Sequence, residues 1–364
     1  MTVRSPSVAG LPDDHPAHRL ADSSYLRACR SAVADRVPVW FQRQAGRSLP
    51  EYRAARAEGS ILESLLRPEL AAEITLQPVR RYGVDAAILF SDIVVPAVAT
   101  GFGIDVVAGV GPVASAPLRS ASDLRRLRPL VAGDDVPYVL ETVKALAAEL
   151  DVPLIAFAGA PFTLASYLVE GRPSRTQART KALMLSDPDV WHSLCGTLVQ
   201  WATEFLRSQV MAGASSIQLF DSWVGTLSPD HYRAYVMPHT QAVFEGVADL
   251  GVPRAHFGLA TGELLGLFAD AGATVVGVDW RVPLDRARSR LPARVAVQGN
   301  LDPAACLAPW PQVQTEVRAV LAANDGRPGH VFNLGHGVLP TTDPAILEQV
   351  VDLVHREGHV HEDS

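Results

Sequence analysis

The sequence predicts an α/β protein with a single (β/α)8 TIM-type barrel, and three observations support this fold class. Eight short apolar runs alternate with amphipathic helical stretches along the chain. The runs are continuously apolar, which is typical of parallel strands buried on both faces. A Gly-rich dinucleotide turn is missing, since Gly101-x-Gly103 lacks the third glycine and opens no helix. These features favour a barrel over a doubly wound sheet.

The elements follow one another with short connections. The predicted strands are residues 37–41, 85–90, 153–158, 216–220, 254–258, 274–278, 294–297 and 330–334. The predicted helices are residues 24–34, 67–82, 138–150, 176–185, 190–212, 229–250, 262–271 and 311–323. Ser228-Pro229 is the clearest helix start, because serine caps the first turn and proline suits its first position.

One domain accounts for nearly the whole chain. Residues 1–20 are rich in Pro, Asp and His and have no charged-then-apolar leader, so we expect a flexible tail. Residues 21–358 form the predicted barrel domain, and residues 359–364 a short C-terminal tail. Residues 94–130 are irregular and predict an inserted hairpin.

Composition restricts the classes of partner and the compartment. A net charge of −7 argues against nucleic acid, which needs a basic field. The most membrane-like run, 94–111, is Gly-rich and interrupted by Asp105, so no segment is expected to cross a membrane. The three cysteines are far apart and form no CxxC pair, which fits buried thiols in a reducing compartment. We therefore expect a cytoplasmic protein.

Polar residues follow the predicted strands where each strand ends. In TIM barrels the carboxyl ends of the strands carry the active-site cleft. The polar residues at these ends include Arg43, Arg47, Asp92, Tyr167, Ser222 and His336. Barrel stability does not require polar residues to converge on one rim, so their convergence favours a site.

Taken singly, these residues leave two interpretations open. Arg43 and Arg47 flank a glycine and offer two planar forks for carboxylates or phosphates, or they are solvated side chains at a strand end. Asp92 is a catalyst, or it is a helix cap or turn former. His336 lies between two glycines and is a functional or a turn residue.

Several strings of the sequence resemble one enzyme family. These strings are PVW-x-x-RQAGR-x-x-PEYR, FSDI, GAPFTLASYLVEG, LFDSWVG, VGVDW, QGNLDP and NLGHGVLPTTDP. They resemble the motifs of the uroporphyrinogen decarboxylase family, in the family's order, and the resemblance covers residues 26–354.

The resemblance implies a reaction and a partner. It implies conversion of the four acetate arms of uroporphyrinogen III into methyl groups, which yields coproporphyrinogen III and carbon dioxide in haem biosynthesis. It also implies a homodimer.

The resemblance assigns roles to residues as well. It implies that Arg43 and Arg47 bind substrate carboxylates, and that Asp92 holds the central pyrrole N–H groups. Tyr167, Ser222 and His336 are implied to contact the macrocycle or its acid arms. The substrate-binding set is completed by Gln44, Ala45, Gly46 and Phe90, and the implied catalytic residues are Asp92, Arg47, Tyr167 and His336.

No cofactor and no metal are expected. The two lysines, Lys144 and Lys181, lie in helical patterns away from the strand ends, and no His/Cys/Asp cluster has metal-ligand spacing. The electron pair left by carbon dioxide must then enter the substrate itself, through a pyrrole protonated beside the acetate. The proton donor stays open among Arg47, Tyr167, His336 and a propionate-bound water.

Three departures from the family's pattern accompany this interpretation. Gln42 and Ser48 stand where the family usually has Met and Tyr, and the segment HFGLATGELL differs from the family's usual fifth-strand sequence.

Three other functions compete with this interpretation. A corrinoid-dependent methyltransferase shares the barrel but needs His and Cys zinc ligands on late strands. The sequence is also compatible with a catalytically inactive tetrapyrrole carrier and with a carboxylate-binding enzyme of another reaction type.

Overall fold

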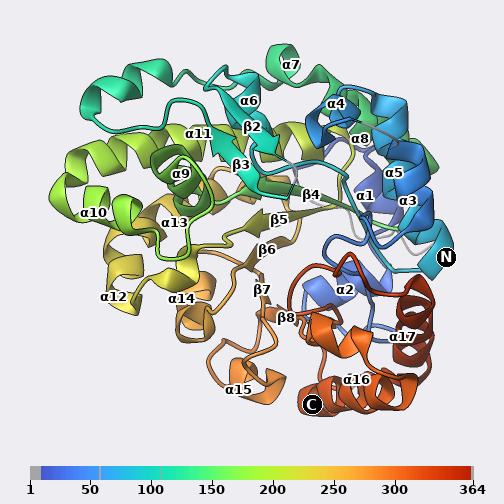
Figure 1. The fold of residues 1–364 in the computed structure, drawn as a ribbon. Helices are drawn as coiled ribbons and strands as arrows, with labels where there is room; N and C mark the ends of the chain where they lie inside the picture. The colour runs from blue at the N-terminus through green and yellow to red at the C-terminus, as the bar shows by residue number, and fades with distance from the viewer. Residues whose placement is uncertain (1–9, 57–58, 108, 362–364) are drawn as a thin grey trace.

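A curled parallel β-sheet surrounded by helices forms the body of the protein (Figure 1). The computed structural model describes residues 10–56, 59–107 and 109–361. The sheet has seven strands in the order β1-β4-β5-β6-β7-β8-β9. They are β1 (Ala87–Ile88), β4 (Leu154–Gly159), β5 (Ser216–Phe220), β6 (Arg254–Phe257), β7 (Val275–Gly277), β8 (Ala296–Gln298) and β9 (His330–Val331).

Seven of the eight predicted apolar runs therefore contain strands of this sheet. Every residue of β4 is buried, as continuous apolarity predicts for a strand covered on both faces. The register pairs Ile155 with Ser216, and Ile217 with Arg254. All six neighbouring pairs are parallel, so the carboxyl ends of the strands lie on one side of the sheet.

The remaining predicted strand, residues 37–41, is the first along the chain and is not a regular strand. Only Val39 makes a bridge, with Phe332 beyond β9. Phe332 N–H donates to Pro38 O at 2.8 Å, while Asp85 N–H donates to Val39 O at 2.8 Å on the side of β1. Because Pro38 has no N–H, it cannot continue a ladder of hydrogen bonds. The prediction of a regular strand here is wrong, although the segment lies between the two edges of the sheet.

The helices cover the outside of the sheet. They are α1 (Pro16–Arg19), α2 (Ser24–Cys29), α3 (Pro50–Arg56), α4 (Ile61–Leu65), α5 (Pro68–Tyr82), α6 (Val95–Ala99), α7 (Ala132–Asp135), α8 (Pro137–Glu149), α9 (Pro161–Glu170), α10 (Ala178–Ser186), α11 (Pro188–Ala212), α12 (Pro229–His231), α13 (Met237–Glu245), α14 (Leu265–Asp270), α15 (Leu284–Arg288), α16 (Trp310–Asn324) and α17 (Pro344–Glu357).

Most predicted helices are present, and one is divided. The predicted helix 229–250 begins at α12, where the Ser228 side chain accepts from His231 N–H as the Ser-Pro signal indicates. A π-helical turn, Tyr232–Val236, then separates α12 from α13. Pro238 stands in the first turn of α13 and supplies no N–H to the preceding turn, which accounts for the break.

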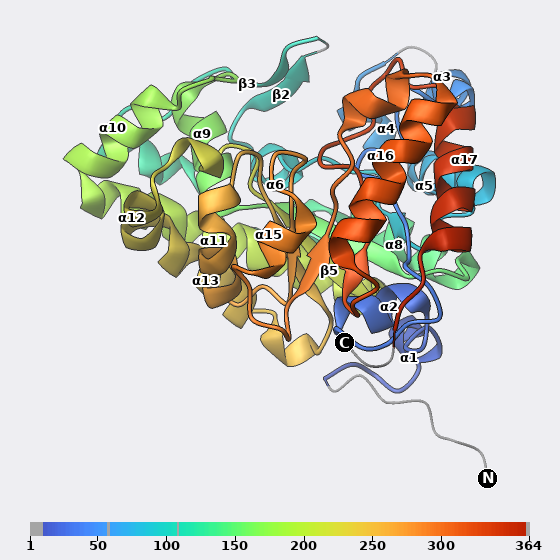
Figure 2. The ribbon, with the colours of Figure 1, turned by 90° about the horizontal axis from the view of Figure 1, so that it is seen from below.

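The predicted insertion contains a hairpin that projects from the carboxyl end of the sheet (Figure 2). β2 (Ile104–Val107) and β3 (Gly111–Ala114) pair antiparallel, with Ile104 opposite Ala114. In the same view α1 and α2 lie at the opposite end of the molecule. The hairpin therefore stands beside the rim to which the strand ends lead.

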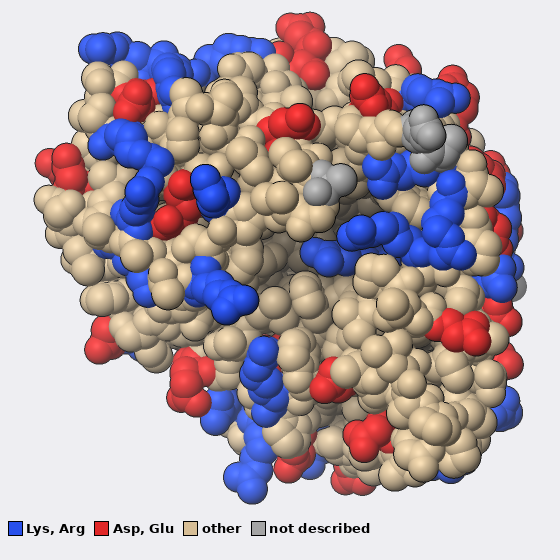
Figure 3. Space-filling view, viewed as in Figure 1, with Lys and Arg blue, Asp and Glu red and all other residues tan. Residues whose placement is uncertain are grey.

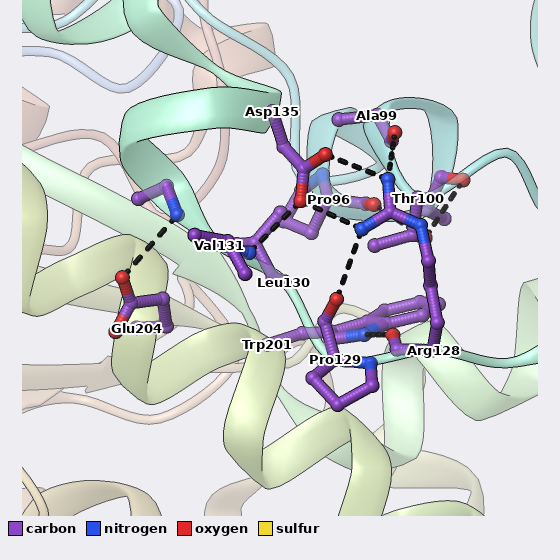
Figure 4. Close-up of polar contacts among 12 residues, drawn as sticks. Pro96, Ala99, Thr100, Arg128, Pro129, Leu130, Val131, Asp135, Trp201 and Glu204 are labelled. Atoms are coloured by element: carbon purple, nitrogen blue, oxygen red, sulfur yellow. Dashed lines mark hydrogen bonds and ion pairs between the residues drawn. The ribbon is translucent and has the colours of Figure 1, made fainter.

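Arg128 fixes the chain where the insertion returns to the helical layer (Figure 4). Its guanidinium donates two hydrogen bonds to Asp135, at 2.6 and 2.8 Å, and one to Ala99 O at 3.0 Å. Trp201 Nε1 donates to the Arg128 carbonyl at 2.7 Å. The planar fork bridges α6 and α7, and the Arg128 carbonyl joins the same segment to α11.

The N-terminal segment contains a helix that the sequence did not predict. Of the predicted tail 1–20, residues 1–9 lie outside the described residues. His15 is buried before α1. It accepts from Ala17 N–H through Nδ1 at 3.1 Å and donates through Nε2 to Val210 O at 2.6 Å.

The three cysteines, Cys29, Cys195 and Cys306, are all buried and free. Among the described residues, none of the helices combines the length and apolarity needed to cross a membrane.

Asp85 ties the irregular segment 37–41 to the helical layer, which leads to a stability prediction. Its carboxylate accepts from Val39 N–H at 2.8 Å, from His355 Nε2 at 2.7 Å and from Arg36 Nη2 at 2.8 Å. We expect Asp85→Asn to lower the free energy of unfolding by about 2 kcal/mol in urea titrations, because charge-assisted bonds to a buried group are lost. Asp230→Asn, which removes an exposed pair with Arg233, is the control and should change little. Equal stabilities of the two variants would contradict the anchoring role.

Candidate functional site

A hollow lies near the centre of the face seen in Figure 3. Basic side chains gather on one side of the hollow, and a further group lies below it over the connection from β7 to α15. The exposed arginines Arg43 and Arg47 belong to the loop that follows the segment 37–41. This loop is the reference point for the remaining predicted site residues.

The loop 42–47 is held by its buried residues. Gln42 N–H donates to Asn333 Oδ1 at 3.0 Å, and Val338 N–H donates to Gln42 O at 2.8 Å. The buried Gln44 side chain accepts from Phe41 N–H at 3.0 Å and donates to Ala86 O at 3.1 Å. These bonds join the loop to β1 on one side and to the chain after β9 on the other. The side chain of Gln44 thus positions the loop.

Arg43 is directed outward by an unusual backbone conformation. Its φ of +59° lies in the left-handed region, which costs a non-glycine residue on the order of 1 kcal/mol. A Cβ on Gly46 would lie 2.8 Å from Arg43 O, so the loop needs glycine there. A Cβ on Gly337 would clash with the aliphatic part of the Arg43 side chain. The glycine after His336 therefore makes room for Arg43.

Arg47 and the residues around it complete the loop. The Arg47 side chain is exposed, and its carbonyl accepts from Arg53 Nη1 at 2.6 Å. Ala45 and Gly46 are half-buried, whereas Ser48 is buried. The loop therefore presents its two predicted arginines to solvent while its remaining side chains pack inward.

Asp92 stands just beyond β1, as predicted, and its environment disfavours its charge. Burial raises the pKa of Asp92, and the Val94 N–H and the Arg43 guanidinium offset this only in part. Val94 N–H donates to Asp92 Oδ1 at 3.0 Å, so the side chain also caps the following turn. Phe90 is buried beside it and packs edge-on against Tyr52, with ring centroids 5.8 Å apart.

Tyr167 projects from α9 toward the same rim. The pKa of its phenol is raised to about 12, mainly by burial; Trp223 and Arg43 oppose the rise, and Asp92 contributes to it. The ring packs edge-on against Trp223, with centroids 6.0 Å apart. Tyr167 is therefore a neutral O–H donor at any physiological pH.

Ser222 is half-buried, and Thr163 holds its two chain neighbours, Asp221 and Trp223. Thr163 Oγ1 donates to Asp221 Oδ1 at 2.7 Å and accepts from Trp223 N–H at 3.2 Å. Asp221 is fully buried, and its Oδ2 lies 3.4 Å from His256 Nε2. Asp221 thus braces the loop that carries Ser222. Sequence reasoning missed Thr163, whose only signal was a hydroxyl two residues after the first proline of a helix.

His336 lies between Gly335, which packs against the backbone of Trp280, and Gly337, which packs against the Arg43 side chain. Its ring stacks on Phe257, with centroids 6.4 Å apart and planes 18° apart. The pKa of His336 is lowered to about 4, mainly by burial; Arg43 and Arg281 contribute to the lowering, and Asp279 opposes it. His336 is therefore neutral at pH 7 and offers one N–H donor and one acceptor.

The structure brings four predicted residues into one electrostatic neighbourhood. The charge of Arg43 acts on Asp92, Tyr167 and His336. Ser222 joins them through the contact of its neighbour Trp223 with Tyr167. The arrangement can bind carboxylates, stabilise a cation over Asp92 and donate hydrogen bonds from neutral groups. Within the part of the chain that the structure describes, no group of three or more His, Cys, Asp and Glu residues is placed to hold a metal ion.

Comparison with known proteins identifies the family. The model of the family described as uroporphyrinogen decarboxylase (URO-D) matches residues 20–357. The chain belongs to the uroporphyrinogen decarboxylase family. A protein named uroporphyrinogen decarboxylase from Salinispora tropica is 60% identical over 336 residues, covering 92% of this chain and 90% of that protein. One of the same name from Thermobifida fusca is 58% identical over 339 residues, covering 93% and 94%.

A solved structure supports the fold of this family member independently. A methyltransferase from Methanosarcina mazei matches with a TM-score of 0.75 at 20% identity, covering 94% of this chain and 98% of that one. At this identity the likeness concerns the fold alone.

The contact between Gly337 and Arg43 leads to a prediction. We expect Gly337→Ala to raise KM for uroporphyrinogen about 10-fold, because the methyl group displaces the Arg43 side chain from the rim, and to destabilise the fold by about 1–3 kcal/mol. Gly133→Ala is the matched control, since a Cβ there meets nothing within 4 Å. Steady-state kinetics and thermal melts measure both effects. A normal KM for Gly337→Ala would show that Arg43 does not depend on this glycine.

Proposed function

We propose that the chain catalyses the cofactor-free decarboxylation of the four acetate arms of uroporphyrinogen III, yielding coproporphyrinogen III and carbon dioxide for haem and other tetrapyrroles. The observation that carries this proposal is the placement of Asp92 and Arg43 beside Tyr167 and His336 on one rim, in a chain matched by the family model over residues 20–357.

The chemistry needs an acceptor for one electron pair, and the substrate provides it. A proton added to the pyrrole carbon beside the acetate-bearing carbon converts the ring into an electron-poor iminium ion. When the bond to the carboxylate breaks, its electron pair moves into this iminium and leaves an exocyclic methylene group. A second proton turns the methylene into a methyl, and loss of the first proton restores the pyrrole. The net change consumes one proton and releases one carbon dioxide per acetate.

Asp92 has the properties that the cationic step requires. Its carboxylate stands in a site where burial raises its pKa, so its charge has less stabilisation than in water. A pyrrole cation above it would supply the missing partner, and a preorganised charge in such a site stabilises a transition state by several kcal/mol. The same oxygens accept hydrogen bonds from pyrrole N–H groups.

The other residues orient and hydrogen-bond the substrate in this proposal. Arg43 and Arg47 bind carboxylate arms through planar forks. Tyr167 and His336 act as neutral donors, because their pKa values of about 12 and about 4 leave little phenolate or imidazolium at pH 7. The remaining proposed substrate contacts are the backbone of Gln44, Ala45 and Gly46, the ring of Phe90 and the hydroxyl of Ser222.

The architecture and the assembly complete the proposal. We propose that residues 37–41 take the place of the eighth strand and close the sheet into a (β/α)8 barrel, which the hydrogen bonds to Phe332 and Asp85 support. Residues 21–358 are the proposed decarboxylase domain. A cytoplasmic homodimer is proposed from the family resemblance, and its mass in sedimentation is the test.

One experiment decides between this function and a tetrapyrrole carrier. The protein is incubated without oxygen with uroporphyrinogen III, and the products are separated by the number of carboxylates. Stepwise loss down to the tetracarboxylate is the expected result. Binding without loss of carboxylates would favour the carrier instead.

The role of Asp92 leads to a kinetic prediction. Asp92→Asn keeps the shape of the side chain but removes the charge, and the pyrrole cation exists only during reaction. We expect kcat to fall at least about 100-fold with a small change in KM. Single-turnover measurements of carbon dioxide release test this, with Asp230→Asn as a surface control. A near-normal kcat with failed binding would make Asp92 a binding residue and reject the mechanism.

The arginine pair should fail in a different way. The arms that Arg43 and Arg47 contact are charged in both the ground and the transition state, so Arg43→Ala or Arg47→Ala should raise KM about 10-fold or more. Partly decarboxylated intermediates should accumulate, because each acetate must be presented in turn. Arg→Lys variants should recover only part of the loss, since a point charge does not reproduce the fork. Full recovery by lysine would contradict bidentate binding.

A further inference from the structure

We propose that a cavity beside His336, with Arg281 at its edge, is a second carboxylate subsite that takes an acid arm of the tetrapyrrole. The inference rests on the proposed function for the identity of the ligand. It adds a substrate contact on the side of the cleft away from the loop 42–47.

The cavity lies at the carboxyl ends of β6 and β7. Its volume is about 410 Å³, enough for a carboxylate arm with its water. The lining residues are Ala260, Gly262, Glu263, Asp279, Arg281, Val282, Pro283, Arg286 and Arg290. Basic side chains are visible over this region, below the central hollow in Figure 3.

Arg281 is held at the edge of the cavity by fixed partners. Its Nη1 donates to Asp279 Oδ2 at 2.6 Å, its backbone N–H donates to Asp279 Oδ1 at 3.0 Å, and its guanidinium lies 4.0 Å from the centroid of the Trp280 ring. Asp279 also accepts from Ala260 N–H at 2.5 Å. About half of the Arg281 side chain remains exposed, at 49%. A guanidinium stacked on an aromatic ring and bonded on one edge keeps its other edge available for an anion.

The cavity adjoins the site already described. A Cβ on Gly335 would clash with the backbone of Trp280, so the chain at His336 packs directly against the residues that carry Arg281. On the other side, Gly337 packs against Arg43. The segment 335–337 thus lies between Trp280, which precedes Arg281, and Arg43, and the charges of both arginines act on His336.

The residues that line the cavity carry a small excess of positive charge. Three arginines line it against two carboxylates, those of Asp279 and Glu263. The Asp279 carboxylate accepts hydrogen bonds from Arg281 and from backbone N–H groups. The exposed Glu263 lies 3.2 Å from Arg290. Arg286 is 75% exposed, and its Nε lies 3.7 Å from Asp285. A ligand that carries acid arms around its whole perimeter needs cations on both sides of the cleft, and this cavity supplies the second side.

The test measures binding of uroporphyrin III, the oxidised ring that has the same acid arms and does not react. We expect Arg281→Ala to raise the Kd about 5-fold and Arg286→Ala about 2-fold, as exposed charge-assisted contacts do. Arg281→Gln keeps much of the side-chain length and should raise the Kd to the same extent as Arg281→Ala. The effect should shrink at high salt. The KM for uroporphyrinogen should rise by the same factors, with kcat within about 2-fold of the parent.

Two control variants test whether the Kd depends on the sign of the charge removed and on its place in the cavity. Glu263→Gln removes a negative charge from the same cavity at a side chain that is 79% exposed, and should leave the Kd unchanged or lower it. Arg233→Ala removes an arginine of similar exposure, 57%, which pairs with Asp230 away from the cavity, and should have no effect.

The outcomes separate this inference from the proposed function. An unchanged Kd in Arg281→Ala and Arg281→Gln, or a Glu263→Gln variant that weakens binding as much as they do, overturns the subsite. If the parent binds uroporphyrin in an Arg281-dependent way but releases no carbon dioxide from uroporphyrinogen, the subsite stands and the proposed reaction fails.

Discussion

The site depends on the anchoring of the loop 42–47 across the gap between β1 and β9. Its glutamines are buried and hydrogen-bonded to both edges, so the exposed Arg43 is fixed although its side chain faces solvent. Gly337 then provides the space that this arginine occupies. Because a guanidinium on a mobile loop would lose rotamer entropy on binding, a fixed one binds a carboxylate at lower cost.

Burial acts on the titratable groups of the rim in one direction, against charge. It raises the pKa values of Asp92 and Tyr167 and lowers that of His336. In the proposed reaction the positive charge arises on the substrate, above the Asp92 carboxylate. Arg43 only partly offsets the effect of burial on this carboxylate. The neutral Tyr167 and His336 add hydrogen bonds without competing for that carboxylate. The site therefore favours charge on the substrate.

The pattern of apolar residues predicted the strands of the sheet well, but it did not predict where prolines interrupt a strand or a helix. The run 216–220 is a strand with the same bounds, because continuous apolarity has one outcome in a sheet covered on both faces. The run 37–41 fails as a strand because Pro38 removes a donor, and the helix 229–250 is interrupted at Pro238 for the same reason. Both prolines are visible in the sequence, but apolarity alone gives them no weight.

Arg43, Asp92, Tyr167 and His336 lie near one another because parallel strands end on one side of a sheet. Thr163 and Arg281 escaped prediction for different reasons. The role of Thr163 lies in a hydrogen bond between two loops, and Arg281 follows its strand two residues later than Asp279, the first polar position after the apolar run. Contacts between distant segments, such as that of Gly335 with Trp280, leave no local pattern in the chain.

The placement of arginines on both sides of His336 bears on how four successive reactions share one site. Each acetate that becomes a methyl loses its charge, whereas the propionates keep theirs through every step. In the proposed mechanism, arginine forks on both sides therefore hold substrate, intermediates and product alike, which is uniform binding and does not by itself accelerate the reaction. In the proposed mechanism the acceleration comes from Asp92, which distinguishes the pyrrole cation from the neutral ring. Binding and catalysis are thus assigned to separate groups, and the ring can turn between steps without losing its hold on the rim.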